Sequence, residues 1–299
     1  MGYKTLFIRD SEKLRLYLDN IVVETNKGDI RFLISDLKCL IIDNYKVVLS
    51  VQLINKLTEN NVACILCNIS HMPYTQLIPI NGNYASSNMI KKQLTWNDEI
   101  KKLIHQRIIQ AKIQSQIEIL RLNQKSESVI ARLIEFKNEV DVGDNGNREG
   151  LAAKMYFREM FGNDFIRFDD NILNAGLNYG YAVFRSLISA IIVSKGLLLN
   201  IGIFHRGPTN PYNLSDDIIE VFRPLVDNYV LNHLMNVEIL TKGHRENLIR
   251  LLDLKIEFNN QMNTINNSIE MYIESIIHCF EENDISLFIS PSLSRIYDI

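Results

Sequence analysis

Apolar residues follow two different periods along this chain, and the change lies near residue 84. Before it, large apolar residues alternate with polar ones or form short branched runs, as in LRLYLDNIVVE, IRFLI, CLIID, VACILC and QLIPI. Both patterns are typical of β-strands, and Asp19-Asn20 inside the first run predicts a hairpin turn. SVQLINKLTEN has helical spacing instead, with Ser50 as its N-cap. Residues 1–84 therefore predict a small, β-rich, sandwich-like domain.

Helical spacing dominates the sequence after residue 84. Thr95 and Asp98 resemble a capping box, and apolar residues from Ile100 to Ala111 then recur at intervals of three and four. Segments rich in Gly, Pro, Asn or Ser interrupt the pattern at VDVGDNGNREG, HRGPTNPYN and the terminal SPSLSRIYDI. The predicted fold class is α+β: the N-terminal β-rich domain of residues 1–84, followed by a larger all-α domain over residues 85–299.

Composition favours a soluble globular protein. Of the 299 residues, 46% are hydrophobic, which is enough for a large core and for two domains. We find no apolar run of the roughly 18 residues that a bilayer span requires, and the N-terminal sequence lacks the features of a signal peptide. The expected location is the cytoplasm, without membrane association.

The four cysteines predict buried structural thiols. Cys64 and Cys67 form a CxxC motif, but it lies in an apolar strand-like run where an odd separation points the two side chains to opposite faces. A second CxxC or a histidine pair would be needed to complete a zinc site, and the surrounding sequence provides neither.

Charge is unevenly distributed, although the net charge is only −3. Residues 91–137 contain ten Lys or Arg and five Asp or Glu, whereas residues 255–299 contain two basic and seven acidic side chains. This asymmetry permits a basic face for a polyanion. A solvated helix face is the alternative interpretation of the same charges.

The stretch GIFHRGPTNPYNLSDDIIEVFRP, Gly202 to Pro224, contains a candidate metal site. If a helix begins near Asn213 or Ser215, Asp217 and Glu220 project from one face, and His205 approaches from the preceding loop. Taken alone the signal is weak, because acidic pairs at this spacing are common on solvated helices and single histidines are usually structural.

Three longer motifs make the interpretation more specific. NREGLAAKMYFREMF, DDNILNAGLNYGYAVFRSLISAIIVSKGLLLNIGIFH and NPYNLSDDIIEVFRPLVD resemble, in order and spacing, the motifs of the CRISPR-associated adaptation integrase family (Cas-one), most closely its type II-A branch. WNDEIKKLIHQRIIQAKIQSQ is similar to that family's first long helix. The resemblance covers nearly the whole chain and implies an N-terminal β domain for dimerisation and partner contact, followed by a helical catalytic domain.

The resemblance also implies the site residues. Glu149 matches the glutamate of the E-G-x-A-A motif, His205 matches the end of G-x-x-H, and Glu220 matches the acidic residue before x-F-R-P. These three are the implied catalytic residues and metal ligands, with Asp217 as a fourth candidate ligand. Carboxylates with one imidazole and no thiolate favour Mg²⁺ or Mn²⁺, with Zn²⁺ as the second choice.

The implied reaction is metal-dependent transesterification in spacer acquisition during antiviral defence. The 3′-hydroxyl of a captured DNA fragment would attack a phosphodiester at the edge of a CRISPR repeat, and a second subunit would repeat the step on the other strand. The implied partners are double-stranded DNA, a second copy of the chain, the second Cas adaptation protein that bridges two dimers, and other type II-A adaptation and effector proteins. A metal-dependent nuclease that hydrolyses branched or single-stranded DNA and a binding scaffold with an unused site are the alternatives.

Further candidates surround the implied site. Tyr179 and Tyr181 match family positions beside the catalytic centre, although aromatic residues at this spacing are more often part of the core. Arg223 is a candidate for holding a carboxylate in place. Phosphate contacts come mainly from Lys and Arg, and the candidate duplex-binding residues are Lys91, Lys92, Lys101, Lys102, Arg107 and Lys112.

Overall fold

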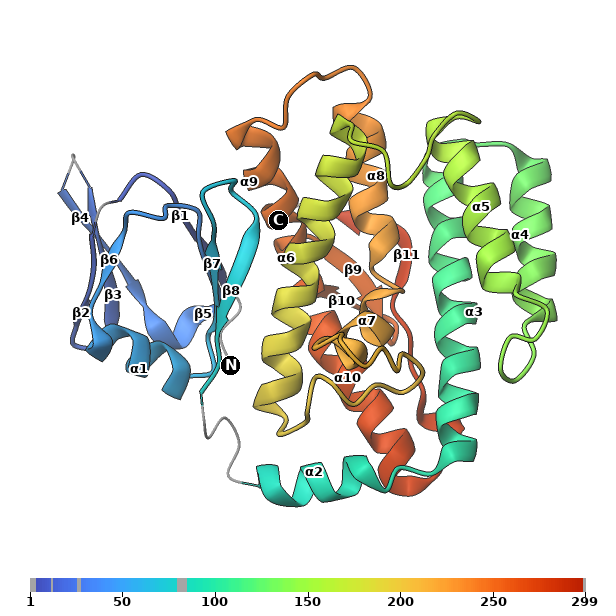
Figure 1. Ribbon diagram of the computed structural model, residues 1–299, viewed down its shortest axis with the longest axis horizontal. Coiled ribbons are helices and arrows are strands. Elements are labelled where there is room, and N and C mark those ends of the chain that lie inside the picture. The colour runs from blue at the N-terminus through green and yellow to red at the C-terminus, as the bar shows by residue number, and fades with distance from the viewer. Residues whose placement is uncertain (1–3, 12, 26–27, 80–84, 298–299) are drawn as a thin grey trace. The chain divides into compact units, whose positions relative to one another are not determined.

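The computed structural model describes residues 4–11, 13–25, 28–79 and 85–297, and the chain divides into two compact units whose elements are labelled in Figure 1. The first unit comprises 1–93 and 182–198, and the second comprises 94–181 and 199–299. Helix α6 (Ile172–Ser194) belongs to both, because the division falls after Tyr181. The domain boundary predicted after residue 84 adjoins residues 80–84, and these five lie outside the described residues.

Within the described residues, the first unit contains two four-stranded sheets. In one of them β1 (Lys4–Ile8), β5 (Leu37–Ile42) and β7 (Ala63–Cys67) run parallel, and β8 (Pro73–Leu77) pairs with β7 in the antiparallel direction. The other has the order β4-β3-β2-β6. Its strands are β2 (Lys13–Tyr17), β3 (Asn20–Thr25), β4 (Gly28–Leu33) and β6 (Val48–Leu49).

Side chains of both sheets and of helix α1 (Val51–Glu59) pack into one apolar core. Leu40 of β5, Ile21 of β3 and Leu53 of α1 are all almost fully buried in it. Removing this apolar surface from water is the main force that holds the two sheets together. The predicted sandwich-like arrangement is therefore confirmed.

Local predictions in this unit agree with the structure to within a few residues. The Ser50 hydroxyl caps α1 by accepting the N–H of Leu53 at 3.2 Å, and the cysteines are buried and unbridged. The hairpin turn lies at Leu18 and Asp19, one residue earlier than expected, with Leu18 in the left-handed region at φ 52°. Strand β8 ends at Leu77, three residues before the predicted run QLIPI ends.

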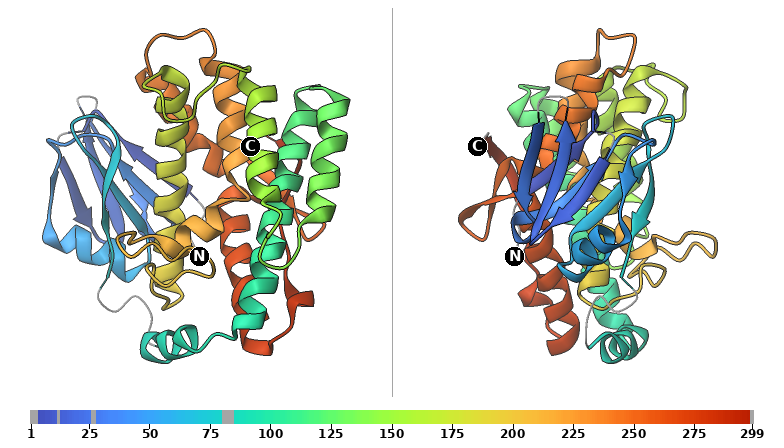
Figure 2. Two further views of the ribbon diagram at one scale, coloured as in Figure 1. Left: turned by 45° about the vertical axis from the view of Figure 1, so that its right-hand side comes forward. Right: turned by 90° about the vertical axis from the view of Figure 1, so that its left-hand side faces the viewer.

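The second unit is built mainly from helices. Helix α3 is capped by the side chain of Asn97, which accepts the N–H of Glu99 at 2.8 Å, so the predicted capping box at Thr95 is wrong by two residues. Figures 1 and 2 show α3, α4 and α5 side by side. The helices are α2 (Ser86–Leu94), most of which belongs to the first unit, and then α3 (Asp98–Leu122), α4 (Glu127–Glu139), α5 (Arg148–Phe161), α7 (Asn213–Ile219), α8 (Arg223–Leu234), α9 (Lys242–Arg250) and α10 (Ile265–Glu282).

A small sheet in the second unit corrects the expectation that residues 85–299 are all helical. Strands β9 (Lys255–Phe258), β10 (Gln261–Thr264) and β11 (Ser292–Tyr297) form an antiparallel sheet of order β10-β9-β11. Asn259 and Asn260, both with positive φ, make its hairpin turn. Strands β9 and β10 have only four residues each, and α10, an amphipathic helix of 18 residues, follows them directly. An alternating pattern of that length is too short to predict a strand.

Helix α6 is long and apolar enough, by length and composition alone, to cross a membrane. The expectation that no apolar run reaches this length is therefore wrong for α6, although 67% of its most apolar stretch is buried inside the protein. Within the second unit, a Cβ atom on Gly180 would lie 2.4 Å from the Cγ1 of Val226 in α8, so only glycine permits this close approach of helices. These contacts are those of a core helix.

Candidate active site

Glu149 is placed in the first turn of α5 by a set of side-chain caps. The carboxylate of Asp144 accepts the N–H groups of Arg148 at 2.8 Å and of Glu149 at 3.0 Å. Asn147 adopts the left-handed conformation with φ 47° and accepts the N–H of Gly150. The polar segment before α5 therefore satisfies the exposed donors of the helix start and fixes the position of Glu149.

His205 is held by Asp217, which lies in α7. The ring Nδ1 of His205 is 2.7 Å from Asp217 Oδ1, and the same carboxylate accepts the backbone N–H groups of Ile203, Phe204 and His205 at 2.5, 3.1 and 3.1 Å. Asp217 is only 3% exposed. Asp217 therefore accepts hydrogen bonds from four donors, one of which is the Nδ1–H of His205. This bond fixes the orientation of the imidazole ring and leaves its Nε2 available to a ligand.

The loop between His205 and α7 depends on two further residues. Buried Asn213 accepts the N–H of Gly207 at 3.1 Å and donates to the carbonyls of Asn200 and Gly207. Gly202 is required by close packing, because a Cβ atom there would lie 2.4 Å from the His205 carbonyl oxygen and 2.8 Å from Asp217 Oδ2. The glycine of G-x-x-H thus makes room for the turn that presents the histidine.

Lys112 of α3 lies between the two glutamates. Its Nζ donates to Glu149 Oε1 at 2.6 Å and forms an ion pair with Glu220 Oε2, also at 2.6 Å. Glu220 directly follows α7, and Glu149 belongs to α5. The tertiary structure therefore brings two carboxylates, more than seventy positions apart in the sequence, to one cation.

Glu220 is ionised despite being buried. Burial by itself would raise its pKa, but the ammonium of Lys112 and the guanidinium of Arg223, whose Nε lies 3.0 Å from Glu220 Oε1, lower the pKa to about 2. Arg223 therefore holds a carboxylate, as the sequence suggested. The hydrogen bond to Asp217 raises the pKa of His205 above its ordinary value, against the opposing effect of burial.

His105 is a neighbour of the site that the sequence analysis missed. Its ring stacks on Phe204 with centroids 3.6 Å apart, and its Nδ1 is buried without a hydrogen-bond partner among the described residues. Burial lowers the pKa of His105, although Glu149 and Asp217 act in the opposite direction. The stack supports the segment that carries His205. No local sequence signal distinguishes this histidine from an ordinary helix residue.

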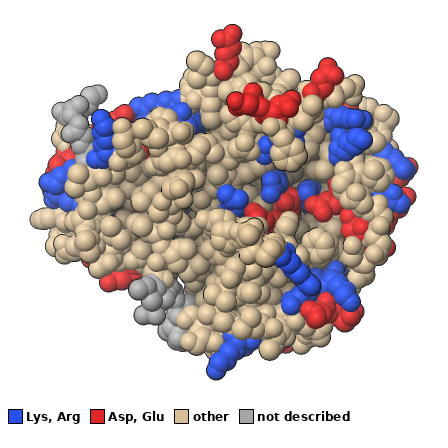
Figure 3. Space-filling view, viewed as in Figure 1, with Lys and Arg blue, Asp and Glu red and all other residues tan. Residues whose placement is uncertain are grey.

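A cavity of 230 Å³ adjoins Glu220. Its lining includes Lys112, Arg167, Tyr181, Arg223 and Asp227. The guanidinium carbons of Arg223 and Arg167 lie 4.7 and 5.3 Å from the centre of the Tyr181 ring. Figure 3 shows acidic and basic side chains gathered in a hollow on this side of the helical unit. The cavity is thus bordered by three cations next to the paired glutamates.

Residues of the N-x-x-L-N-Y-G-Y motif shape this cavity. Arg167 donates to the side-chain oxygens of Asn174 at 3.1 Å and Asn178 at 2.8 Å. The Tyr181 hydroxyl donates to the buried carboxylate of Asp227, and Tyr179 is fully buried. Tyr181 is therefore beside the site, whereas Tyr179 is buried in the core.

Asp227 gives a prediction about pH. Burial raises its pKa to about 7, although the hydrogen bond from Tyr181 opposes the shift. The folded protein then retains a proton that the unfolded chain releases near pH 3.8, so this contribution to stability is largest at low pH and is lost as the pH rises towards 7. Relative to Asp227→Asn, the wild-type free energy of unfolding should fall by about 2 kcal/mol between pH 5 and 7.5. Urea unfolding of both proteins measures this, and a difference independent of pH would contradict it.

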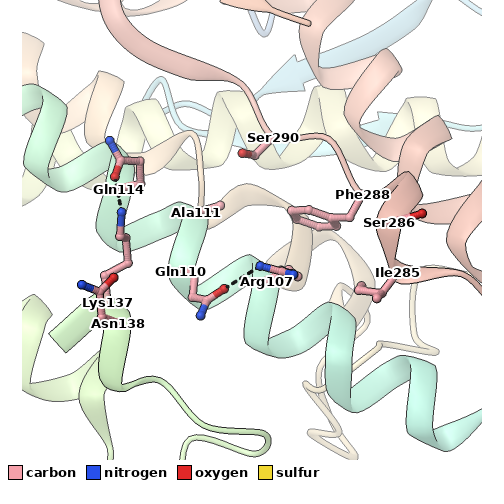
Figure 4. Close-up of a pocket in the computed structure, with 10 residues that line it drawn as sticks. All are labelled: Arg107, Gln110, Ala111, Gln114, Lys137, Asn138, Ile285, Ser286, Phe288 and Ser290. Atoms are coloured by element: carbon pink, nitrogen blue, oxygen red, sulfur yellow. Dashed lines mark hydrogen bonds between the residues drawn. The ribbon is translucent and has the colours of Figure 1, made fainter. Parts of the chain in front are cut away.

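The predicted basic residues of α3 do not all lie on one face of that helix. Lys101 and Lys102 form i,i+3 ion pairs with Asp98 and Glu99. Arg107 lies on the side of α3 roughly opposite Lys112 and borders a second cavity of 560 Å³, where it contacts Gln110 and where Lys137 contacts Gln114 (Figure 4). Lys112 lies between the glutamates and not on an exposed basic face. Lys91 and Lys92 belong to α2 in the first unit.

In the described part of the chain, no group of three His, Cys, Asp or Glu side chains is close enough to hold a metal ion. The carboxylates of Glu149 and Glu220 nevertheless both contact the ammonium of Lys112. The two side chains are therefore close enough to bind one cation together. Their donor set, oxygen with one adjacent imidazole, fits a hard divalent cation.

Comparison with known proteins identifies the family. The family model described as "CRISPR associated protein Cas1" matches residues 6–252. The chain belongs to the Cas1 family. The CRISPR-associated endonuclease Cas1 of Neisseria meningitidis serogroup C (strain 8013) is 32% identical over 264 residues, which cover 87% of this chain and 86% of that protein. As a Cas1 protein the chain is an endonuclease-type enzyme of CRISPR adaptation, so the family inferred from the sequence motifs is confirmed.

Solved structures share the Cas1 fold. A casposase bound to integration product superposes with a TM-score of 0.75 at 19% identity, covering 95% of this chain and 92% of that one. A Cas1 protein from Thermotoga maritima has a TM-score of 0.72 at 17% identity, with coverage of 93% and 97%. A Cas6-RT-Cas1–Cas2 complex has a TM-score of 0.72 at 16% identity, with coverage of 96% and 36%. The predicted α+β class, β-rich at the N-terminus and largely helical afterwards, is confirmed.

Proposed function

We propose that this Cas1 protein joins the 3′-hydroxyl ends of captured DNA fragments to the repeat of a CRISPR array by metal-dependent transesterification. The observation that carries the proposal is the convergence of Glu149 and Glu220 on one cation, next to a cavity bordered by arginines. His205, oriented by Asp217, completes the proposed catalytic set.

The proposed cofactor is Mg²⁺ or Mn²⁺. Glu149 and Glu220 would supply oxygen ligands, and His205 would supply Nε2, because its Nδ1 faces Asp217. Asp217 is proposed to position His205 and not to bind the metal itself. A bound divalent cation would polarise the attacked phosphate and stabilise the leaving oxygen. Arg223 keeps Glu220 ionised, and Arg167 adds positive charge where phosphate groups approach.

The proposed assembly follows from the need for two joining reactions. A spacer has two ends, so two active sites must be held at a fixed separation, and we propose that homodimers bridged by the second adaptation protein provide it. The Cas6-RT-Cas1–Cas2 complex, which contains a chain of this fold, is compatible with this proposal. Assignment to the type II-A branch and location in the cytoplasm are part of the same proposal.

Dideoxy-terminated DNA fragments test the reaction. Purified protein is mixed with its adaptation partner, a labelled fragment, a repeat-containing plasmid and Mg²⁺ or Mn²⁺. Fragments with 3′-hydroxyl ends should transfer label to the plasmid. Dideoxy ends should abolish transfer while fragment affinity changes less than about twofold, because the missing oxygens remove the nucleophile but none of the phosphate contacts that provide affinity.

Hydrolysis is the second candidate, since the Neisseria relative is named an endonuclease. A nuclease uses water as its nucleophile and would still cut the plasmid in the presence of dideoxy fragments. Plasmid cleavage that is unaffected by dideoxy ends, together with absent joining by normal fragments, would overturn the integrase proposal. Absence of any metal-dependent reaction, with DNA binding intact, would instead support a scaffold.

A further inference from the structure

Lys112 differs from the other lysines of α3 in its partners. Its side chain is 14% exposed, close to the 17% of Lys101, but it pairs with two glutamates from outside its helix, whereas Lys101 and Lys102 pair with Asp98 and Glu99 of α3 itself. Burial by itself would lower the pKa of Lys112, but Glu220 and Glu149 outweigh this and raise it above the ordinary value. Each of the two glutamates contacts Nζ at 2.6 Å, so Lys112 is held between two carboxylates as an ammonium.

This ammonium and a divalent cation compete for the same oxygen atoms. A metal bound by Glu149 and Glu220 would place two positive charges next to Nζ, and cations at such short separation repel strongly in a buried site. The lysine side chain is flexible, with a compact charge and three donors. Displacement of Nζ is thus the simplest way to admit a metal without moving the helices.

The adjoining 230 Å³ cavity offers the ammonium a second location, since Lys112 itself lines it. Arg167 and Arg223 already border this space. Of its two acidic neighbours, Glu220 would be engaged by the metal, and Asp227 accepts the Tyr181 hydroxyl. Three cations around one small cavity suit a phosphate group of the DNA backbone.

We propose that Lys112 exchanges partners: it holds Glu149 and Glu220 together in the metal-free protein, and it binds a backbone phosphate in the adjoining cavity once a divalent cation takes its place. The phosphate part rests on the proposed reaction with DNA, and the competition rests on the proposed metal site but not on strand joining. Lys112 thereby prevents the two carboxylates from repelling each other before the metal binds, and it couples metal entry to contact with DNA.

Mn²⁺ binding without DNA tests the competition. Free Mn²⁺ is followed by electron paramagnetic resonance during titration of the wild type, Lys112→Met and Lys154→Met. Lys112→Met should bind Mn²⁺ about tenfold more tightly or better, because a competing charge is removed. Lys154 is exposed on α5, so Lys154→Met, the matched control, should stay within about twofold of the wild type. Equal or weaker Mn²⁺ binding by Lys112→Met would overturn the proposal.

The salt dependence of DNA binding tests the exchange. With saturating Mn²⁺, the slope of log Kd against log salt should be smaller by about 0.9 for Lys112→Met than for the wild type, which corresponds to one lost phosphate contact. Without metal the two slopes should agree, because Lys112 then remains with the glutamates. Slopes that differ equally with and without metal would contradict the exchange.

The wild-type protein provides a measurement that does not depend on how the variant folds. Reductive methylation of Lys112, followed by mass spectrometry, should become several-fold faster on addition of Mg²⁺ and slow again when DNA is added. An unchanged rate with Mg²⁺ would refute the displacement of Nζ. None of these measurements requires strand joining, so a failure of the integrase proposal would be recognised separately.

Discussion

Replacing Glu220 by glutamine is expected to lower the rate of strand joining by about 10³-fold or more, because it removes the negative charge of a proposed ligand of the divalent cation. Glutamine preserves the shape of the side chain at a position that is only 12% exposed. Glu149→Gln and His205→Ala should cause losses of similar size. Joining is measured as transfer of labelled fragment to plasmid, under single-turnover conditions with saturating Mn²⁺.

Glu159→Gln is the matched control for the glutamate variants. Glu159 belongs to α5 like Glu149, but its carboxylate accepts the backbone N–H of Ser126 at 3.0 Å. Its substitution should change joining less than about threefold, because its carboxylate holds the start of α4 and is not one of the proposed metal ligands. If Glu220→Gln, Glu149→Gln or His205→Ala kept more than about a tenth of wild-type activity, that residue would be removed from the catalytic set.

Asp217→Ala is expected to be nearly as damaging, and also to destabilise the protein. The substitution leaves three backbone N–H groups and the His205 ring without their acceptor in a buried loop. Each buried, unsatisfied donor costs about 1–3 kcal/mol, and partial relaxation of the loop brings the expected total loss to roughly 3–5 kcal/mol. Joining should fall by about 100-fold or more, because His205 loses its orientation.

Asp216→Ala provides the comparison within the same helix. Asp216 is half-buried and accepts the side-chain amide of Asn210 at 2.7 Å, and losing this hydrogen bond should cost about 1 kcal/mol. Urea unfolding gives the stabilities, and the joining assay gives the activities. If Asp217→Ala were as stable as wild type and defective only in Mn²⁺ affinity, Asp217 would be a metal ligand instead of the residue that orients His205.

The catalytic motifs could be recognised in the sequence because each is a local requirement. Gly202 leaves room for the turn before His205, and Gly180 allows α6 to approach α8. Such requirements fix residue types at fixed spacing, so the motifs identify the family without any coordinates. The strand periods and the Ser50 cap are local in the same sense, and they were predicted nearly to the residue.

The roles of Asp217 and Lys112 could not be predicted in this way. Asp217 and Glu220 look equivalent at a spacing of three, yet one faces a loop and accepts four hydrogen bonds while the other faces α3 and α5. Lys112 reads as one more basic residue of an amphipathic helix. The partners of each side chain depend on the elements that pack against its face of the helix. No short window of sequence encodes those elements.

By itself, the sequence determined the family, the α+β class and the identities of Glu149, His205 and Glu220 as candidates, since short-range periodicity and motif spacing record local geometry. Only the tertiary structure showed that Glu149 and Glu220 contact the same ammonium of Lys112 and that Asp217 accepts a hydrogen bond from His205. It also showed that His105 stacks beside the site and that the helical unit contains a small sheet. The physical reason is that burial and Coulomb interactions depend on distances in space, which long-range packing sets between residues far apart in the chain.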